Sequence, residues 1–233
     1  MVIHIVTVDL RSPEVRFRVT PGDPDDQLPL EARTTSQFLR EFDLQLAING
    51  DSFSPWHSNG FFDYYPHRGD RVAPTGFAAS MGEVYSSQTD AEPVLYIART
   101  NRARFNTPIG KVYNAISGNI MLVERGQAAT FPNDSPQPRT ALALDKAGKR
   151  LTIVVVDGRQ PSYSQGATLE ELAEILLDQG SYYGMNLDGG GSSTLVRAGP
   201  GGLPVLLNSP IEHGIPGRQR VVGNHLGIYA GPP

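Results

Sequence analysis

The sequence predicts a single α+β domain with a mostly antiparallel mixed sheet and few helices, spanning residues 1–233. Three observations predict it. Short β-branched or alternating apolar runs outnumber helical patterns along the whole chain. The 25 glycines and 19 prolines are typical of many turns and long loops. The length and the 39% hydrophobic content suit one large domain, and no internal repeat divides it.

The strands are expected where apolar runs alternate or are rich in β-branched residues. "VIHIVTVDL" (2–10) and "VRFRV" (15–19) alternate, whereas "RLTIVVV" (150–156) is continuously apolar and predicts a central strand. Further strands are expected at 44–48, 94–98, 102–105, 115–127, 140–145, 182–186, 203–208 and 225–230.

Two helices carry clear start signals. Thr34 with Gln37 forms the capping-box pattern before an apolar stretch, which predicts a short helix. Thr168 with Glu171 repeats the pattern before "LEELAEILLDQG", whose leucines share one face and which Gly180 ends. This second helix is expected to be the longer one.

Residues 51–82 form a loop-like segment with an aromatic insert at about 54–80. "FSPWHSNGFFDYYPHRG" contains six aromatic residues, among them the one tryptophan, Trp56. A loop this aromatic is costly to leave exposed, so we expect an ordered lid. Residues 56–71 are predicted to pack along the rim of a functional pocket.

Composition and motifs exclude several function classes. The net charge of -4 and the pI near 5.7 predict no nucleic-acid partner and no attraction to an anionic membrane. No apolar run approaches the roughly 18 residues of a membrane span. With no cysteine there is no disulfide framework and no thiol nucleophile. Phosphate-loop, G-x-S-x-G and H-E-x-x-H motifs are absent, and the five histidines lack ligand spacing, so neither a metal site nor a cofactor is expected.

Polar groups follow or precede four of the expected strands, where a rigid scaffold usually holds its reactive residues. The four are Asn49-Gly50-Asp51, Pro138-Arg139-Thr140, Asp157-Gly158-Arg159 and Asp188 with its glycines. An Asp-Gly pair alone is most often a plain turn. For Arg159, a surface salt bridge explains the residue as well as a place in a site does.

The stretch "NLDGGGSSTLV" (186–196) is the strongest functional signal. A turn needs one glycine, whereas Gly189, Gly190 and Gly191 in succession let a ligand or another backbone come very close. Exposed backbone N–H groups beside Ser192 and Ser193 would form a nest for an anion or a sugar hydroxyl.

These residues lead to a resemblance. The segments "AINGDSF", "SGNIMLVERG", "PRTALALD", "IVVVDGR", "GATLEELAEILLDQG", "MNLDGGGSSTLV" and "RVVGNHLGIY" occur in the order of the phosphodiester glycosidase family. The likeness spans about residues 45–230, and the aromatic insert is not part of the general pattern. It implies a site formed by Asn49, Gly118, Arg139, Asp157, Asp188, Gly189, Gly190, Gly191, Ser192, Ser193, Arg220 and Asn224, to which we add Asp51 as a substrate-binding residue.

The resemblance implies a hydrolase that cuts between a sugar's anomeric carbon and a phosphodiester oxygen, with a sugar 1-phosphodiester or a phosphate-containing glycan as partner. Asp188, Asp157 and Arg139 are the expected catalytic residues. The separation of the two carboxyl groups would distinguish retention, at about 5 Å, from inversion, at about 6.5–9.5 Å. The family also suggests an extracytoplasmic location, although "MVIHIVTVDLRSP" has no signal-peptide pattern.

Two other classes stay open. A non-catalytic carbohydrate-binding module would use the aromatic insert to stack on sugar rings. A metal-dependent phosphodiesterase would use Asp51, Asp157 and Asp188 as oxygen ligands and would cut the phosphorus–oxygen bond.

Overall fold

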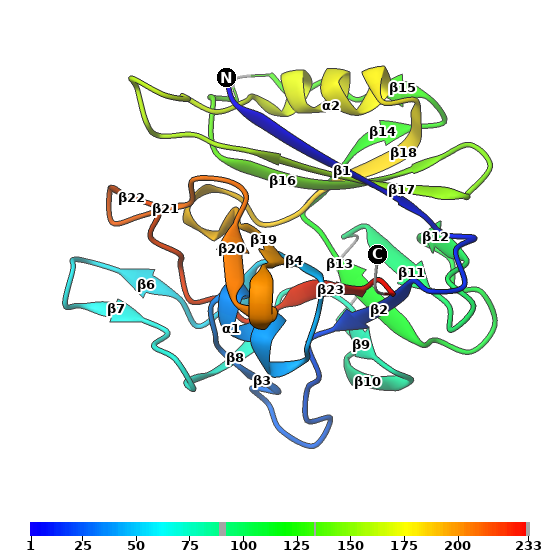
Figure 1. Cartoon of the computed structure of the whole chain (residues 1–233), viewed down its shortest axis with the longest axis horizontal. Helices are drawn as coiled ribbons and strands as arrows, with labels where there is room; N and C mark the ends of the chain where they lie inside the picture. Colours follow the sequence, from blue (N-terminus) through cyan, green and yellow to red (C-terminus); the bar gives the residue numbers. More distant parts are fainter. Residues whose placement is uncertain (89–91, 133, 232–233) are drawn as a thin grey trace.

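The structure, a computed structural model, describes residues 1–88, 92–132 and 134–231. It confirms the α+β class: every pairing between the described strands is antiparallel, and the described part of the chain has two α-helices, α1 (Thr35–Glu41) and α2 (Leu169–Asp178). The elements stack in layers, with α2 on one outer side and α1 on the other (Figure 1). None of these helices is long and apolar enough to span a membrane.

The first layer is a six-stranded sheet under α2. Its strands lie in the order β1 (Ile3–Asp9), β17 (Arg150–Val156), β16 (Arg139–Asp145), β18 (Ser181–Asn186), β14 (Ile120–Glu124) and β15 (Gln127–Ala128). Leu172 and Leu176 of α2 pack with Val154 and Val156 of β17 on one face, whereas Ile153 and its alternate neighbours enter the central core on the other. The continuously apolar β17 is therefore central and buried on both faces, as its sequence predicts.

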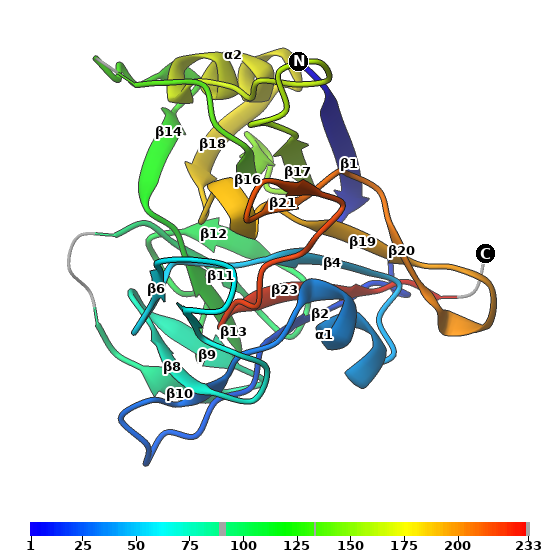
Figure 2. The ribbon, with the colours of Figure 1, turned by 90° about the vertical axis from the view of Figure 1, so that its left-hand side faces the viewer.

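The opposite layer contains two five-stranded sheets. One has the order β2 (Arg16–Val19), β23 (His225–Tyr229), β4 (Leu46–Asn49), β19 (Leu195–Ala198) and β20 (Pro204–Leu206), and α1 covers its outer face. The other has the order β10 (Glu83–Ser86), β9 (Ala78–Ser80), β13 (Asn114–Ser117), β11 (Val94–Ile97) and β12 (Ala103–Phe105). Figure 2 shows both facing the six-stranded sheet.

The main core lies between these layers. Ile48 of β4, Leu95 of β11, Leu142 of β16 and Leu226 of β23 belong to one buried cluster, so all three sheets share it. The shared core fixes the ends of β4, β16 and β18 relative to one another. Those ends carry the polar residues singled out in the sequence.

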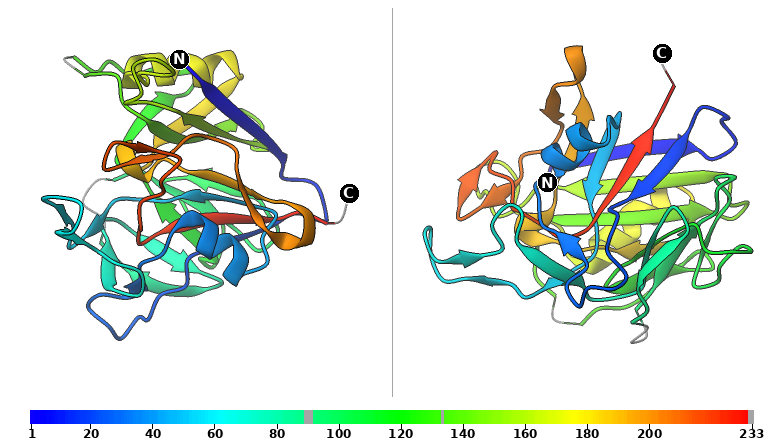
Figure 3. Two further views of the ribbon diagram at one scale, coloured as in Figure 1. Left: turned by 60° about the vertical axis from the view of Figure 1, so that its left-hand side comes forward. Right: turned by 90° about the horizontal axis from the view of Figure 1, so that it is seen from below.

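The remaining elements are short. They are β3 (Leu30–Glu31), β5 (Phe53–Ser54), β6 (His57–Ser58), β7 (Tyr64–Tyr65), β8 (Arg71–Pro74), β21 (Ile211–Glu212), β22 (Ile215–Pro216), and the 3₁₀ turns η1 (Gly190–Ser192) and η2 (Pro200–Gly202). The hairpins β6–β7 and β21–β22 extend on the same side of the molecule (Figure 3).

Both predicted capping boxes are confirmed. The Thr34 hydroxyl accepts a hydrogen bond from the Gln37 N–H, and the Thr168 hydroxyl accepts one from the Glu171 N–H. The Gln37 and Glu171 side chains in turn accept from the backbone N–H groups of Thr34 and Thr168. Gly180 adopts φ +72° directly after α2, the conformation that favours glycine at a helix end. These helix-end signals depend only on residues close together along the chain, so they can be predicted from the sequence.

The insert differs from the expectation in its extent. Within residues 54–80, β8 pairs with β3 and β5, and β9 belongs to a five-stranded sheet; Val72 and Ala78 are fully buried. The exposed residues of this segment lie between positions 54 and 69, in and beside the hairpin of β6 and β7. Its Phe62 is 92% exposed, so apolar character did not force this whole loop against the protein.

Candidate active site

One pocket, with a volume of about 410 Å³, collects the ends of several strands. It is lined by Asp188, Gly189, Gly190, Arg139, Arg159 and Arg220, together with Ser52, Phe53, Trp56, Asn119, Gln137 and Asn186. Residues from position 52 to position 220 thus meet in one place. Arg159, for which the sequence left a site role open, is among the lining residues. Asn119, Gln137 and Asn186 were not among the expected site residues, although each lies within or next to a motif, which was the available signal.

Asp188 lies two residues after the end of β18. Its backbone N–H donates to the Gly50 carbonyl at 3.1 Å, and its own carbonyl accepts from Asn49 Nδ2 at 2.8 Å. The Gly189 N–H donates to the carboxylate at 2.9 Å, and the Ser192 hydroxyl also donates to it. The carboxylate therefore has a fixed position at the pocket wall.

Burial raises the pKa of Asp188 above its usual value of 3.8, while the Ser192 hydrogen bond and the Arg220 charge oppose the shift. A carboxylate that is poorly solvated yet directed into a pocket is typical of a functional group rather than of a structural one.

Each of the three consecutive glycines after Asp188 is required for a different steric reason. Gly190 has φ +61°, and a Cβ there would stand 2.9 Å from Arg159 Nη2. A Cβ on Gly189 would stand 2.9 Å from the Pro138 carbonyl oxygen, and one on Gly191 would collide with Glu212 and Arg220. The glycines let two arginines and a neighbouring backbone pass close to Asp188.

Two of the pocket arginines are held by carboxylates. Arg139, the first residue of β16, donates through Nη2 to Asp134 at 2.6 Å and through Nε to the Ala167 carbonyl at 3.0 Å. Arg220 donates through Nε to Glu212 at 2.8 Å, and its guanidinium lies 5.0 Å from the Trp56 ring centroid. Both guanidinium groups are oriented before any ligand arrives.

Arg159 is the third pocket arginine and is held differently. It donates through Nε to Gln137 Oε1 at 2.7 Å, and the salt bridges among the described residues include none from Arg159. Burial lowers its pKa, with the Arg220 charge as the next cause. The open alternative of a surface salt bridge is thus not what the structure has: Arg159 faces other cations across the pocket, an arrangement suited to an anion.

Asp157 lies outside the pocket lining. It is 1% exposed, and its Oδ1 accepts from Asn208 Nδ2 at 3.0 Å and the Ser209 N–H at 2.8 Å. Its Oδ2 lies 2.9 Å from His4 Nε2 and accepts from the Tyr163 hydroxyl at 3.2 Å. With both oxygens occupied, this carboxylate fastens the start of the chain, and we no longer assign it to catalysis. Without Asp157 in the pocket, Asp188 has no second carboxylate opposite it among the described lining residues. The distance expected to distinguish retention from inversion therefore cannot be applied.

Three other expected residues hold the strands and loops that surround the pocket. Asn49 is fully buried; its Oδ1 accepts from Thr140 Oγ1 at 2.8 Å and the Thr194 N–H at 3.1 Å, so it ties β4 to β16 and to the loop of Asp188. Asn224 accepts from the His225 N–H through Oδ1, and its carbonyl accepts from Gly50. Gly118 packs against the Asn186 carbonyl, where a Cβ would collide.

Asp51 is likewise buried, and it accepts from the Ser52 and Gly76 N–H groups and the Ser117 hydroxyl. Burial raises its pKa to about 6. Ser193 is buried, and its Oγ has no hydrogen-bond partner among the described residues. Neither residue lines the pocket.

The ligand set of the metal-dependent alternative is not assembled. Asp157 is engaged elsewhere, and within the described ranges no three His, Cys, Asp or Glu side chains are grouped to hold a metal ion.

Fold and pocket together define an α+β protein with a pocket in which one carboxylate lies among three guanidinium groups. The model of the phosphodiester glycosidase family matches residues 42–229, and the chain belongs to this family. The zebrafish N-acetylglucosamine-1-phosphodiester alpha-N-acetylglucosaminidase catalytic domain, auto-inhibited by its pro-peptide, has the same fold with a TM-score of 0.68 at 20% identity, covering 97% of this chain and 82% of that one.

Two further relatives extend the comparison. A putative exported protein from Burkholderia pseudomallei K96243 matches with a TM-score of 0.70 at 13% identity, over 97% of this chain and 73% of its own. The bovine N-acetylglucosamine-1-phosphodiester alpha-N-acetylglucosaminidase is 40% identical over 75 residues, 32% of this chain. The chain spans only 13% of that relative's length.

Proposed function

We propose that this protein hydrolyses the bond between the anomeric carbon of a sugar and the phosphate oxygen of a sugar 1-phosphodiester. The observation that carries the proposal is the shared pocket: Asp188 and the guanidinium groups of Arg139, Arg159 and Arg220 all line it. Family membership gives the reaction class, and the charges in the pocket suit the substrate.

The arginines would bind the phosphodiester and stabilise its charge as the bond breaks. A phosphomonoester leaves as a stable anion, so it needs less help from a general acid than an ordinary sugar leaving group. It needs cations instead. A preorganised donor directed at developing charge is worth on the order of 3 kcal/mol of barrier.

Asp188 would act on the sugar side. As the carbon–oxygen bond breaks, positive charge develops at the anomeric carbon, and a carboxylate can attack that carbon or remove a proton from the attacking water. Asp188 is the one carboxylate among the described residues that line the pocket. Both routes require its ionised form.

The test is hydrolysis of a panel of sugar 1-phosphodiesters in ¹⁸O-labelled water. Cleavage at the anomeric carbon puts the label into the released sugar. Label in the phosphate would mean phosphorus–oxygen cleavage and would support a phosphodiesterase instead. A carbohydrate-binding module would give a different pair of results. The wild type would release no sugar from any diester, and the Asp188→Asn variant would still bind the same carbohydrate.

A further inference from the structure

A second hollow adjoins the pocket on its uncharged side. This groove, about 630 Å³ in volume, runs along β14 and β15, and Asn119 lines both it and the pocket of Asp188. The backbone N–H of Asn119 donates to the Asn186 carbonyl at 2.9 Å, so the junction is held at the end of β18. Asn119 is therefore the wall residue that the pocket and the groove have in common.

The sheet places the groove away from Arg139. In the order β16-β18-β14-β15, Asn186 pairs with Ala141 on one side and with Ile120 on the other. Two strand spacings, roughly 10 Å, thus separate the first residues of β16 from those of β14. That distance accommodates a phosphate group and one sugar ring between Arg139 and the mouth of the groove.

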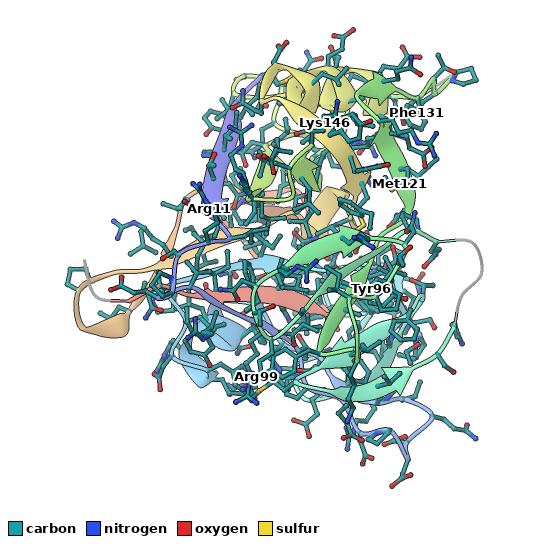
Figure 4. All side chains as sticks on the ribbon, turned by 90° about the vertical axis from the view of Figure 1, so that its right-hand side faces the viewer. Arg11, Tyr96, Arg99, Met121, Phe131 and Lys146 are labelled. Carbon is teal, nitrogen blue, oxygen red and sulfur yellow. The ribbon has the colours of Figure 1, made fainter. Side chains whose placement is uncertain are left out.

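The groove offers uncharged chemistry. Asn106, Asn119 and Gln127 contribute exposed amides, and Met121 and Phe131 contribute half-buried apolar surface. In Figure 4, Met121 and Phe131 lie along the same edge of the molecule. Glu124 is the one charged side chain among the described groove residues, and none is a cation. Amide groups beside an apolar floor match the hydroxyls and the C–H face of a neutral pyranose, and they do not match a phosphate.

We propose that the groove binds further neutral sugar residues attached to the sugar whose bond is cut, so that the preferred substrate is an oligosaccharide or polysaccharide 1-phosphodiester. The inference rests on the proposed function for the position of the phosphate at the arginines. The inference adds a substrate class to the proposed function, because a protein that binds a single sugar would need no groove beyond Asn119.

The experiment compares two substrates with the same scissile bond: the methyl phosphodiester of a single sugar and that of its tetrasaccharide, each in glucose, N-acetylglucosamine and mannose series. For the matching series, the wild type is expected to have a kcat/KM about tenfold higher on the tetrasaccharide, since an apolar contact of this kind discriminates by that order. Ala128→Trp fills the groove from an exposed position on β15 and should abolish that advantage while leaving the single-sugar rate within about twofold.

Val84→Trp, at another exposed position on β10 away from the groove, should leave both rates unaltered. Equal kcat/KM for the two substrates in every cleaved series, or an Ala128→Trp that slows both alike, overturns the groove assignment. Binding of the neutral tetrasaccharides is titrated in parallel. If no diester is cleaved, the proposed hydrolysis fails. A tetrasaccharide that the wild type binds and the Ala128→Trp variant does not would still support the groove. If the wild type binds none of the tetrasaccharides, the groove assignment is overturned.

Discussion

Asp157-Gly158-Arg159 and Asp188-Gly189-Gly190 look alike in the sequence, since each places an Asp-Gly pair after a buried strand. In the structure they do opposite things. Asp188 faces the pocket with a raised pKa, whereas Asp157 turns away and is enclosed by His4, Tyr163, Asn208 and Ser209. The segment Asp157-Gly158-Arg159 places Arg159 in the pocket lining instead. Similar local sequence therefore supplies an anion in one case and a cation in the other.

The largest expected effect separates the two aspartates. Asp188→Asn should reduce hydrolysis of a sugar 1-phosphodiester on the order of a thousandfold or more, because the amide cannot act as nucleophile or base. Its thermal midpoint should stay level or rise, because burial disfavours the charged carboxylate that the variant removes. A rate close to wild type, measured with folded protein, would end the assignment of Asp188.

Gly190→Val tests the space that links the two segments. The residue has φ +61°, which a β-branched side chain tolerates poorly, and the new Cβ would press on the Arg159 guanidinium. Misplacement of this kind is expected to lower kcat/KM on the order of a hundredfold. Gly201→Val, at φ +67° but with nothing within 4 Å of its Cβ, carries the same backbone strain and serves as the control in matched rate and melting measurements.

Arg159→Ala removes the cation that the segment Asp157-Gly158-Arg159 contributes to the pocket. Loss of a charge-assisted hydrogen bond to the phosphate should lower kcat/KM roughly ten- to hundredfold. Inorganic phosphate should also become a weaker competitive inhibitor. Arg159→Lys keeps the charge but not the bidentate geometry, so it should recover part of the loss. Unchanged inhibition by phosphate in both variants would place the phosphate elsewhere.

The pH dependence should follow Asp188. Its folded pKa is raised above 3.8, so activity falls about tenfold per pH unit below that raised pKa as the carboxylate gains a proton. Stability has the opposite pH dependence. The folded state binds the Asp188 proton more tightly than the unfolded chain does. The stability contributed by protonated Asp188 is therefore fully present below pH 3.8 and is lost as pH rises through the folded pKa. Asp51, with a pKa of about 6, has the same sign. The difference between wild-type and Asp188→Asn unfolding curves across pH isolates Asp188.

Asp157→Asn should affect the rate least. Its carboxylate holds four hydrogen-bond partners, so exchanging one oxygen for an amide donor is expected to cost about 2 kcal/mol of unfolding free energy in urea titrations. The folded fraction should keep its turnover within about threefold. A rate loss as large as that of Asp188→Asn would return Asp157 to catalysis.

The sequence predicted what depends on neighbours along the chain. Both capping boxes, the stop at Gly180 and the buried β17 rest on spacing and periodicity alone. The pocket position of Asp188 was predictable because three consecutive glycines have few other uses.

The fate of Asp157 was not readable in the same way. Its partners are Asn208, 51 residues away, and His4, 153 residues away, and only the folded chain brings them together. Arg159 takes a left-handed conformation with φ +57°, which directs its side chain differently from that of a continuing strand. Distant packing decides which of the two side chains reaches the pocket.

Asn49 joins three parts of the molecule through one side chain: β4 of one sheet, Thr140 of the facing sheet and the main chain of Asp188. Separating the two sheets and dispersing the site are consequently one thermodynamic event. A ligand held at Asp188 adds its binding free energy to the cohesion of the whole domain, by RT ln(1 + [L]/Kd). Substrate occupancy should thus be visible far from the pocket, as slower hydrogen exchange at the amides of β4 and β16.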